Sequence, residues 1–147
     1  MKMDLDYLSK ILNVFIESDK PHVSWEDVEE QGVDLGADDD KSISFQKFYF
    51  HLHLILDNEL ISNEFRKMSS LEDLGLDIYF GEGYSINHDM PLRLTQKGHD
   101  FAASLNNKLV LDKLKTELKD APFKAVFDGG QKLLQHYFKK KIEEMIE

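Results

Sequence analysis

The chain has 147 residues, with 18 lysines and arginines against 28 aspartates and glutamates, and it contains no cysteine. This length suits one ordinary domain with a short appendage, and 41% hydrophobic residues with ten phenylalanines can fill a core, which excludes wholesale disorder. The lack of cysteine excludes disulfides, thiolate nucleophiles and thiolate zinc sites. No apolar run approaches the roughly 20 residues that span a bilayer, and the opening MKMDLDYL is unlike a signal peptide, so we expect a soluble, cytoplasmic protein without membrane contacts.

The negative charge is concentrated in the first quarter of the chain. Residues 1–40 hold three lysines against twelve acids, a formal charge of −9, whereas residues 41–147 hold 15 basic and 16 acidic residues. Such a surface repels phosphate and suits a basic partner, although charge runs often face water without any role. The predicted acidic partner surface consists of Glu26, Asp27, Glu29, Glu30, Asp38, Asp39 and Asp40.

Three helices are predicted in the first 58 residues. Apolar residues at three- and four-residue steps predict a helix from Asp4 to about Glu17. Ser24 is a favourable N-cap for a short helix over Trp25–Glu30, and a wide apolar face predicts a third helix from about Ser44 to Asn58, capped by Ser42 or Ser44. The side of the third helix that is expected to face solvent carries Gln46, Lys47, His51 and Asp57.

The middle of the chain predicts short strands, and its last third predicts helices. The strands are expected at Leu60–Ser62, Leu76–Phe80, Tyr84–Ile86 and Pro91–Leu94, with a hairpin turn at Gly81–Gly83. Thr95 should cap a helix that continues through Leu109 to about Leu118, and Gly98 should let the preceding strand approach that helix. Because Gly129 and Gly130 interrupt the apolar pattern after Pro122, the final amphipathic helix is predicted to begin at about Gln131.

Three helices, a short strand, a hairpin and a returning strand follow the element order of a winged helix-turn-helix. The predicted fold is therefore α+β and mostly α. It has a winged-helix domain over residues 1–104 and a C-terminal two-helix extension over residues 105–147.

Three segments resemble a winged-helix family of unknown function that is common in phage and prophage genes. They are Met3–Leu12 (MDLDYLSKIL), His51–Ile61 (HLHLILDNELI) and Leu92–Phe101 (LRLTQKGHDF), of which the last is the most specific. The resemblance covers nearly the whole chain, except that residues 62–90 are longer than a minimal wing and the loop around Asp38–Asp40 looks inserted. It implies a mobile-element origin, no known catalysis and no particular ligand.

A winged helix can bind double-stranded DNA through its third helix and wing. Gln46, Lys47 and His51 could reach base edges, and phosphate contacts could come from Lys41, Arg66, Lys67 and Arg93. The helix that would cross the DNA backbone, Trp25–Glu30, carries four acids and no base, which opposes binding to phosphate. A DNA-binding transcriptional regulator therefore remains the alternative interpretation.

No catalytic, cofactor or metal site is predicted. His51 and His53 are two residues apart on a helix and so point to different faces, and Asp38–Asp40 lacks the alternating ligands of a calcium loop. Gly81-Glu82-Gly83 lacks a phosphate-binding fingerprint, and no serine lies in a nucleophile elbow. The chain is therefore expected not to be an enzyme.

The last helix has a broader apolar stripe than one neighbour needs, so it either packs on its own domain or pairs across a two-fold axis. The candidate self-association residues are Leu133, Leu134, Tyr137, Phe138 and Ile142. The preferred interpretation is a non-enzymatic binding module that acts by protein–protein interaction, forms a homodimer and offers its acidic surface to a basic partner.

Overall fold

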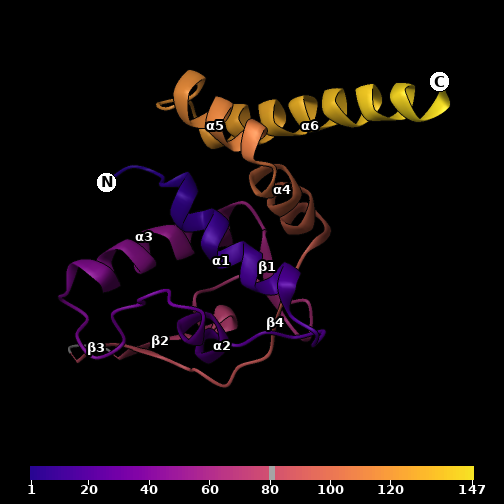
Figure 1. Cartoon of the computed structure of the whole chain (residues 1–147). Coiled ribbons are helices and arrows are strands. Elements are labelled where there is room, and N and C mark those ends of the chain that lie inside the picture. The colour runs from indigo at the N-terminus through magenta and orange to yellow at the C-terminus, as the bar shows by residue number, and fades with distance from the viewer. Residues whose placement is uncertain (80–81) are drawn as a thin grey trace. The chain divides into compact units, whose positions relative to one another are not determined.

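The computed structural model describes residues 1–79 and 82–147 as an α+β chain that is mostly helical (Figure 1). The chain divides into two compact units, Met1–His99 and Asp100–Glu147. We call them the first and second units and describe each by itself. No helix within the described residues combines the length and the apolar content that crossing a membrane requires.

The helices and strands of the described residues come in a simple order along the chain. They are α1 (Leu5–Glu17), α2 (Trp25–Glu30), α3 (Ile43–Asp57), β1 (Ile61–Asn63), a short 3-10 helix η1 (Glu72–Leu74), β2 (Leu76–Tyr79), β3 (Gly83–Ile86), β4 (Leu92–Leu94), α4 (Gln96–Asn106), α5 (Lys108–Glu117) and α6 (Phe123–Ile146).

Side-chain caps determine where the first three helices begin. Asp4 accepts a hydrogen bond from the Tyr7 N–H at the start of α1. Ser24 and Asp27 form a reciprocal capping box at the start of α2, which confirms the predicted N-cap. Ser42, the earlier of the two candidate caps, accepts from the Phe45 N–H, so α3 begins at Ile43.

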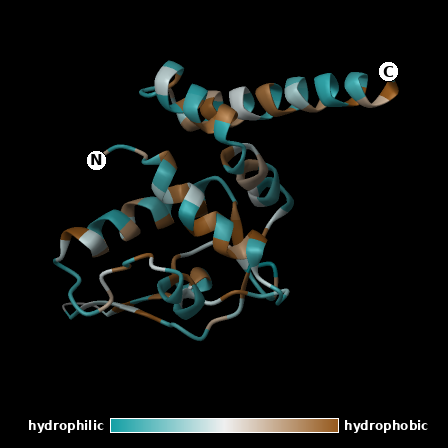
Figure 2. Ribbon diagram, viewed as in Figure 1, coloured by the Kyte–Doolittle hydropathy of each residue, from teal (hydrophilic) through white to brown (hydrophobic). Residues whose placement is uncertain are grey.

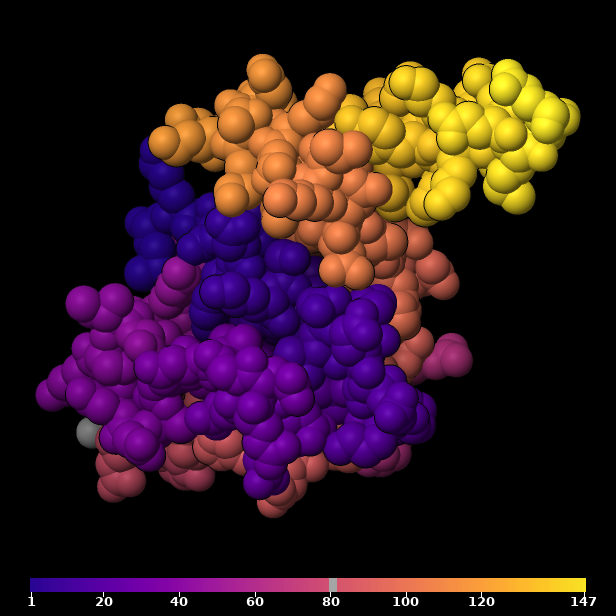
Figure 3. All heavy atoms as spheres, viewed as in Figure 1, coloured from indigo at the N-terminus to yellow at the C-terminus, as the bar shows by residue number. Residues whose placement is uncertain are grey.

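The core of the first unit is aromatic and aliphatic. Trp25 of α2 is fully buried, packs edge-on against Phe48 of α3 at a centroid distance of 5.0 Å, and donates its indole N–H to the Leu74 carbonyl at 2.6 Å. Leu8 and Ile11 bring the apolar face of α1 into the same core. Figure 3 shows that the indigo-to-purple part of the chain, which includes these helices, covers one face of this unit.

Two antiparallel strand pairs complete the first unit. β1 pairs with β4, with Ile61 opposite Leu94, and Val23 forms an isolated bridge to Leu92 on β4. β2 pairs with β3, which confirms the predicted hairpin over its described residues. Of the predicted strand end and turn, Phe80 and Gly81 lie outside the described residues.

The junction between β4 and α4 forms as the sequence predicts. The Thr95 hydroxyl accepts from the Gly98 N–H and donates to the Glu59 carbonyl at 2.6 Å. A Cβ atom on Gly98 would collide with the carbonyl of Leu60, the residue before β1, so glycine permits close approach of α4 to the start of β1, whereas the prediction assigned that approach to the preceding strand.

The predicted helix boundaries in the second unit are wrong. The predicted long helix ends at Asn106, because Asn107 leaves the helical conformation and its side chain caps α5 by accepting from the Val110 N–H. The final helix begins at Phe123, not at about Gln131, and it continues through Gly129 and Gly130. A Cβ atom on Gly130 would lie 2.9 Å from the Ser104 hydroxyl oxygen, so this glycine allows helices to pack closely instead of ending one.

Candidate functional site

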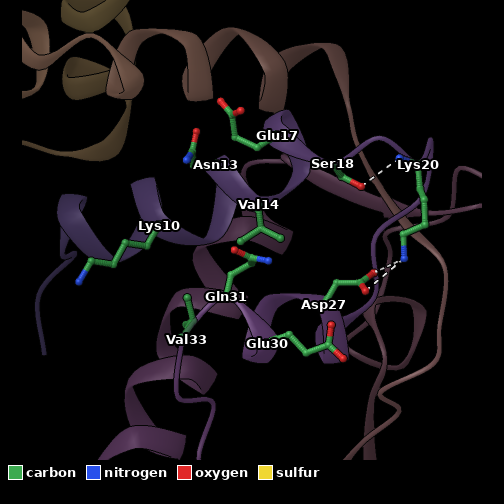
Figure 4. Close-up of a pocket in the computed structure, with 11 residues that line it drawn as sticks. Lys10, Asn13, Val14, Glu17, Ser18, Lys20, Asp27, Glu30, Gln31 and Val33 are labelled. Carbon is green, nitrogen blue, oxygen red and sulfur yellow. Dashed lines mark hydrogen bonds and ion pairs between the residues drawn. The ribbon is translucent and has the colours of Figure 1, made fainter.

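The first unit has a cleft of about 550 Å³ between α1 and α2 (Figure 4). Its wall is mixed, with Val14 and Val33 as apolar side chains and Lys10, Glu17, Lys20 and Glu30 among the charged ones. Asp27 and Glu30 connect the cleft to the predicted acidic partner surface.

Two of the charged groups in the cleft stabilise the local fold. The Lys20 ammonium lies 3.0 Å from the Asp27 carboxylate, and the Lys20 N–H is bound by the Ser18 hydroxyl. The backbone N–H of Ser24 is the main cause that lowers the pKa of Asp27, and the Lys20 ammonium lowers it further. Asp27 is therefore an ionised capping residue.

The remaining charged side chains of the cleft do not converge. In Figure 4, Glu17 and Asn13 point to one side of the cleft, Glu30 points to the other, and Lys10 points away from both. A general acid and a base must both reach one reacting atom. The cleft thus offers polar contacts to a ligand without an arrangement of residues that resembles a catalytic pair.

The prediction that His51 lies on the solvent-facing side of α3 is wrong, because His51 is fully buried. Its Nε2 accepts from the Asp4 N–H at 2.9 Å, and its Nδ1 lies 2.7 Å from the Lys47 carbonyl, to which it donates. Burial lowers the pKa of His51, which favours this neutral form. His51 therefore joins α1 to α3 and does not face a groove.

The other two base-edge candidates on α3 contact acidic parts of the chain. Lys47 lies 2.7 Å from the Asp4 carboxylate and 4.8 Å from the centroid of the Tyr7 ring. Partial burial opposes ionisation of Asp4, but the Lys47 ammonium and the Tyr7 N–H outweigh it and lower the pKa of Asp4. Gln46 is exposed and donates to the Asp40 carbonyl at 2.6 Å.

The β2–β3 hairpin lies against one side of α3. Tyr84 of β3 packs against Phe45 and Tyr49 at centroid distances of 5.8 and 5.1 Å, and the two tyrosine hydroxyls lie 3.3 Å apart. The Asp40 carboxylate lies directly against Gly83, where β3 begins. The aspartate run before α3 is therefore next to both the helix and the hairpin.

The other candidate phosphate contacts lie mostly on other elements. Lys41 is exposed just before α3, and Arg66 and Lys67 are exposed on the turn after β1. Arg93 is half-buried on β4, with one guanidinium nitrogen 3.4 Å from the Ser62 hydroxyl. These basic groups thus come from three separate segments of the chain.

All seven predicted acidic residues reach the surface to some degree. Glu26, Glu30, Asp38 and Asp39 are exposed, whereas Asp27, Glu29 and Asp40 are half-buried. Glu29 lies 2.6 Å from the His88 imidazole. In total the first unit holds nine lysines and arginines against twenty acids, a formal charge of −11.

The predicted self-association residues divide into two groups. Leu134 is buried and Leu133 and Tyr137 are half-buried, whereas Phe138 and Ile142 are exposed. Met145 and Ile146 are also exposed, and the prediction did not include them among the self-association residues. Their spacing from Phe138, seven and eight residues, is the signal that would have identified them.

Among residues 1–79 and 82–147, no group of three or more histidines and acids is arranged to hold a metal ion. A scan of the sequence against models of known protein families finds no match, and searches of curated proteins and of solved structures find no significant match either.

Proposed function

We propose that this chain is a non-enzymatic binding module in which a winged-helix arrangement presents an acidic surface to a basic segment of a protein partner. The acidic surface comprises the four acidic residues of α2 and the aspartate run of residues 38–40, and Asp40 lies against the hairpin. The phage or prophage origin implied by the resemblance belongs to the same proposal.

The strand pairing supports the winged-helix part of the proposal. Three helices come first, then β1 pairs with the returning strand β4, and the chain before α2 joins β4 through Val23. The β2–β3 hairpin lies between β1 and β4 in the sequence, which is the place of a wing.

The position of Asp40 is the observation that carries the proposal. Its carbonyl accepts from Gln46 near the start of α3, and its carboxylate lies against Gly83 of the hairpin. Asp40 therefore lies next to both the helix and the wing that would approach DNA, and its carboxylate lies at the wing. Because DNA affinity depends chiefly on neutralising phosphates, this arrangement favours a cationic protein segment over a nucleic acid.

The charges on α3 support the same choice. Lys47 is the one lysine or arginine within α3, and it is already paired with Asp4. A DNA-reading helix needs free donors and nearby cations. The scattered carboxylates of the α1–α2 cleft support the non-enzymatic part, because they do not form an acid–base pair.

A binding assay with defined probes tests the proposal. In fluorescence anisotropy at low salt, we expect a labelled ten-residue oligolysine peptide to bind saturably and double-stranded DNA not to bind. A triple variant (Asp38→Asn, Asp39→Asn and Asp40→Asn) should weaken peptide binding about tenfold or more, because screened carboxylates that act together each contribute modestly.

A matched control separates a local effect from total charge. The triple variant Asp57→Asn, Glu59→Gln and Glu64→Gln removes the same number of carboxylates at and beyond the other end of α3. It should bind the peptide nearly as well as the unmodified chain. The proposal would be refuted if the two triple variants lost peptide affinity equally, or if the unmodified chain bound DNA tightly.

A further inference from the structure

The second unit covers only the first half of its longest helix, α6. Val126 and Gly130 are buried, and Leu134 is 8% exposed. Phe101 packs against Phe123 at a centroid distance of 5.0 Å. Within this unit, α6 continues past α5 as a single helix (Figure 1).

The second half of α6 displays a continuous apolar stripe. Phe138 is 55% exposed, Ile142 is 54% exposed, and Met145 and Ile146 are more than 70% exposed. At about 100° per residue, these four side chains and Leu134 lie within an arc of about 120° of the helix. The exposed stripe thus extends the buried one, and Figure 2 shows brown apolar residues recurring among polar ones along α6.

Such a stripe indicates a missing packing partner. Isolated helices shorter than about 12–15 residues are marginal in water, and most helix stability in proteins comes from packing of the apolar face. Large apolar side chains gathered on one exposed face are typical of interaction surfaces.

The charges beside the stripe indicate which partner fits. Lys139 and Lys141 border the stripe, Lys140 lies on the opposite face of the helix, and Glu143 and Glu144 follow one turn later. None of these five side chains forms an ion pair within the part of the chain that the structure describes. The segment therefore carries a basic half and an acidic half, both available to a partner.

We propose that Phe138–Ile146 binds the same segment of a second copy of this chain, in an antiparallel pair with a two-fold axis near Ile142. In that alignment Lys139 and Lys141, which border the stripe, lie level with the turn of the second copy that carries Glu143 and Glu144, and Phe138 lies level with its Ile146. A parallel alignment would bring like charges level instead. Flanking charges of this kind set the orientation of paired helices, and a two-fold axis makes one patch complementary to itself.

The charge of the two units supports self-association through α6. The second unit holds nine lysines against eight acids, whereas the first unit carries a formal charge of −11. Two copies can meet at the nearly neutral unit without the repulsion that two acidic surfaces would create. The pairing of α6 does not depend on the proposed basic partner, so either proposal can fail alone.

The first experiment measures the mass of the full chain in solution over a dilution series, by sedimentation or light scattering. The unmodified chain should be a dimer that dissociates on dilution. Ile142→Asp should raise the dissociation constant more than about tenfold, because the two-fold axis would place two buried carboxylates together. Leu109→Asp changes a residue of similar exposure, 60%, on α5 and should leave the dimer intact. Circular dichroism shows whether each variant keeps its helix content.

The second experiment determines the orientation. The chain has no cysteine, so single cysteines can be placed without background. Phe138→Cys and Ile146→Cys are mixed and oxidised, and mass spectrometry distinguishes the products because the variants differ in mass. An antiparallel pair gives mainly the mixed disulfide, whereas a parallel pair gives the two symmetric disulfides and overturns the proposal.

Other results would also overturn it. A chain that stays monomeric at every concentration does not pair through α6, and a dimer that Ile142→Asp leaves unchanged uses another surface. A monomer that co-sediments with vesicles of anionic phospholipid, and loses that binding in Ile142→Asp, would assign the stripe to a membrane surface instead of a second copy.

Discussion

The two units of this chain differ in how they cover the apolar faces of their helices. In the first unit α1, α2 and α3 bury their apolar faces around Trp25 and Phe48, and the surface carries the excess of acids. In the second unit α6 buries its first half and leaves Phe138 and Ile142 exposed beside nearly balanced charges. The comparison indicates a well-packed acidic body in the first unit and an incomplete helical surface in the second.

The largest expected effect comes from the core of the first unit. Trp25→Ala should destabilise that unit by about 4 kcal/mol, since it leaves a cavity and removes the donor to the Leu74 carbonyl. Hydrogen exchange measured by mass spectrometry should show lost protection in α1–α3 and unchanged protection in α5 and α6. Phe65→Ala, at a side chain that is 74% exposed, is the control. Equal loss in both units would show that they do not fold separately.

A matching change in the second unit tests its packing. Gly130→Val should destabilise that unit by about 2 kcal/mol, because a branched side chain must displace Ser104 and the helix next to it. Protection should fall in α5 and α6 and stay unchanged in α1–α3. Gln135→Val introduces the same side chain at an exposed position of α6, where it does not contact Ser104, so it should lower the stability of the unit only slightly. A neutral Gly130→Val would contradict close packing at this glycine.

A pH effect should be specific to the first unit. Burial lowers the pKa of His51 below its ordinary value of 6.5, so the unfolded chain binds this proton more readily. The free energy of unfolding that depends on neutral His51 is therefore fully present above pH 6.5 and decreases as the pH falls below 6.5. The charged and titratable groups around the ring are Asp4, Lys47 and Tyr7, and Asp4 titrates only at lower pH.

Denaturation at pH 7.5 and pH 5 measures this effect. His51→Gln should lose less stability than the unmodified chain over that interval, whereas His136→Gln, at an exposed position of α6, should behave like the unmodified chain. If His51→Gln keeps the full pH dependence, another group causes it.

The smallest expected effect concerns the ion pair between α3 and the start of α1. The Lys47 and Asp4 side chains are 38% and 39% exposed, so solvent screens them, and Lys47→Met should cost only about 0.5 kcal/mol. The cost should shrink at high salt. Lys41 is exposed and forms no ion pair with the residues that the structure describes. Lys41→Met should therefore leave the free energy of unfolding unchanged in the same denaturation experiment.

Local signals in the sequence predict much of the first unit. Ser24 with Asp27 at the third helical position is a capping pattern whose bonds form within four residues, so it needs no distant contact. The bond from the Gly98 N–H to the Thr95 hydroxyl that caps α4 is also local, and the alternation around Arg93 identifies β4.

Contacts between distant segments account for the failures. A pair of glycines often ends a helix, but Gly129 and Gly130 lie inside α6, where Leu118 and Ser104 approach them closely. Periodicity places His51 near polar residues and so predicts an exposed side chain. Its burial depends on Asp4, which is 47 residues away in the sequence.

The candidate site also combines features that local sequence signals predict with contacts that depend on distant segments. The sequence identifies the acidic residues and the apolar positions Phe138 and Ile142, because composition and helical spacing are visible without coordinates. That Asp40 touches the hairpin and that Lys47 is already paired could not be derived from the sequence alone. In each of these contacts the two partners are more than 40 residues apart in the chain.

By itself the sequence determined the N-cap of α2, the strand order, the acidic character and the amphipathic nature of α6, because caps, periodicity and charge act over a few residues. Only the tertiary structure decided which side chains of α3 remain free, where the aspartate run lies, and how far the stripe of α6 is covered. Those outcomes depend on loop closure and on close packing between segments far apart in the chain, and the fold alone brings such segments together.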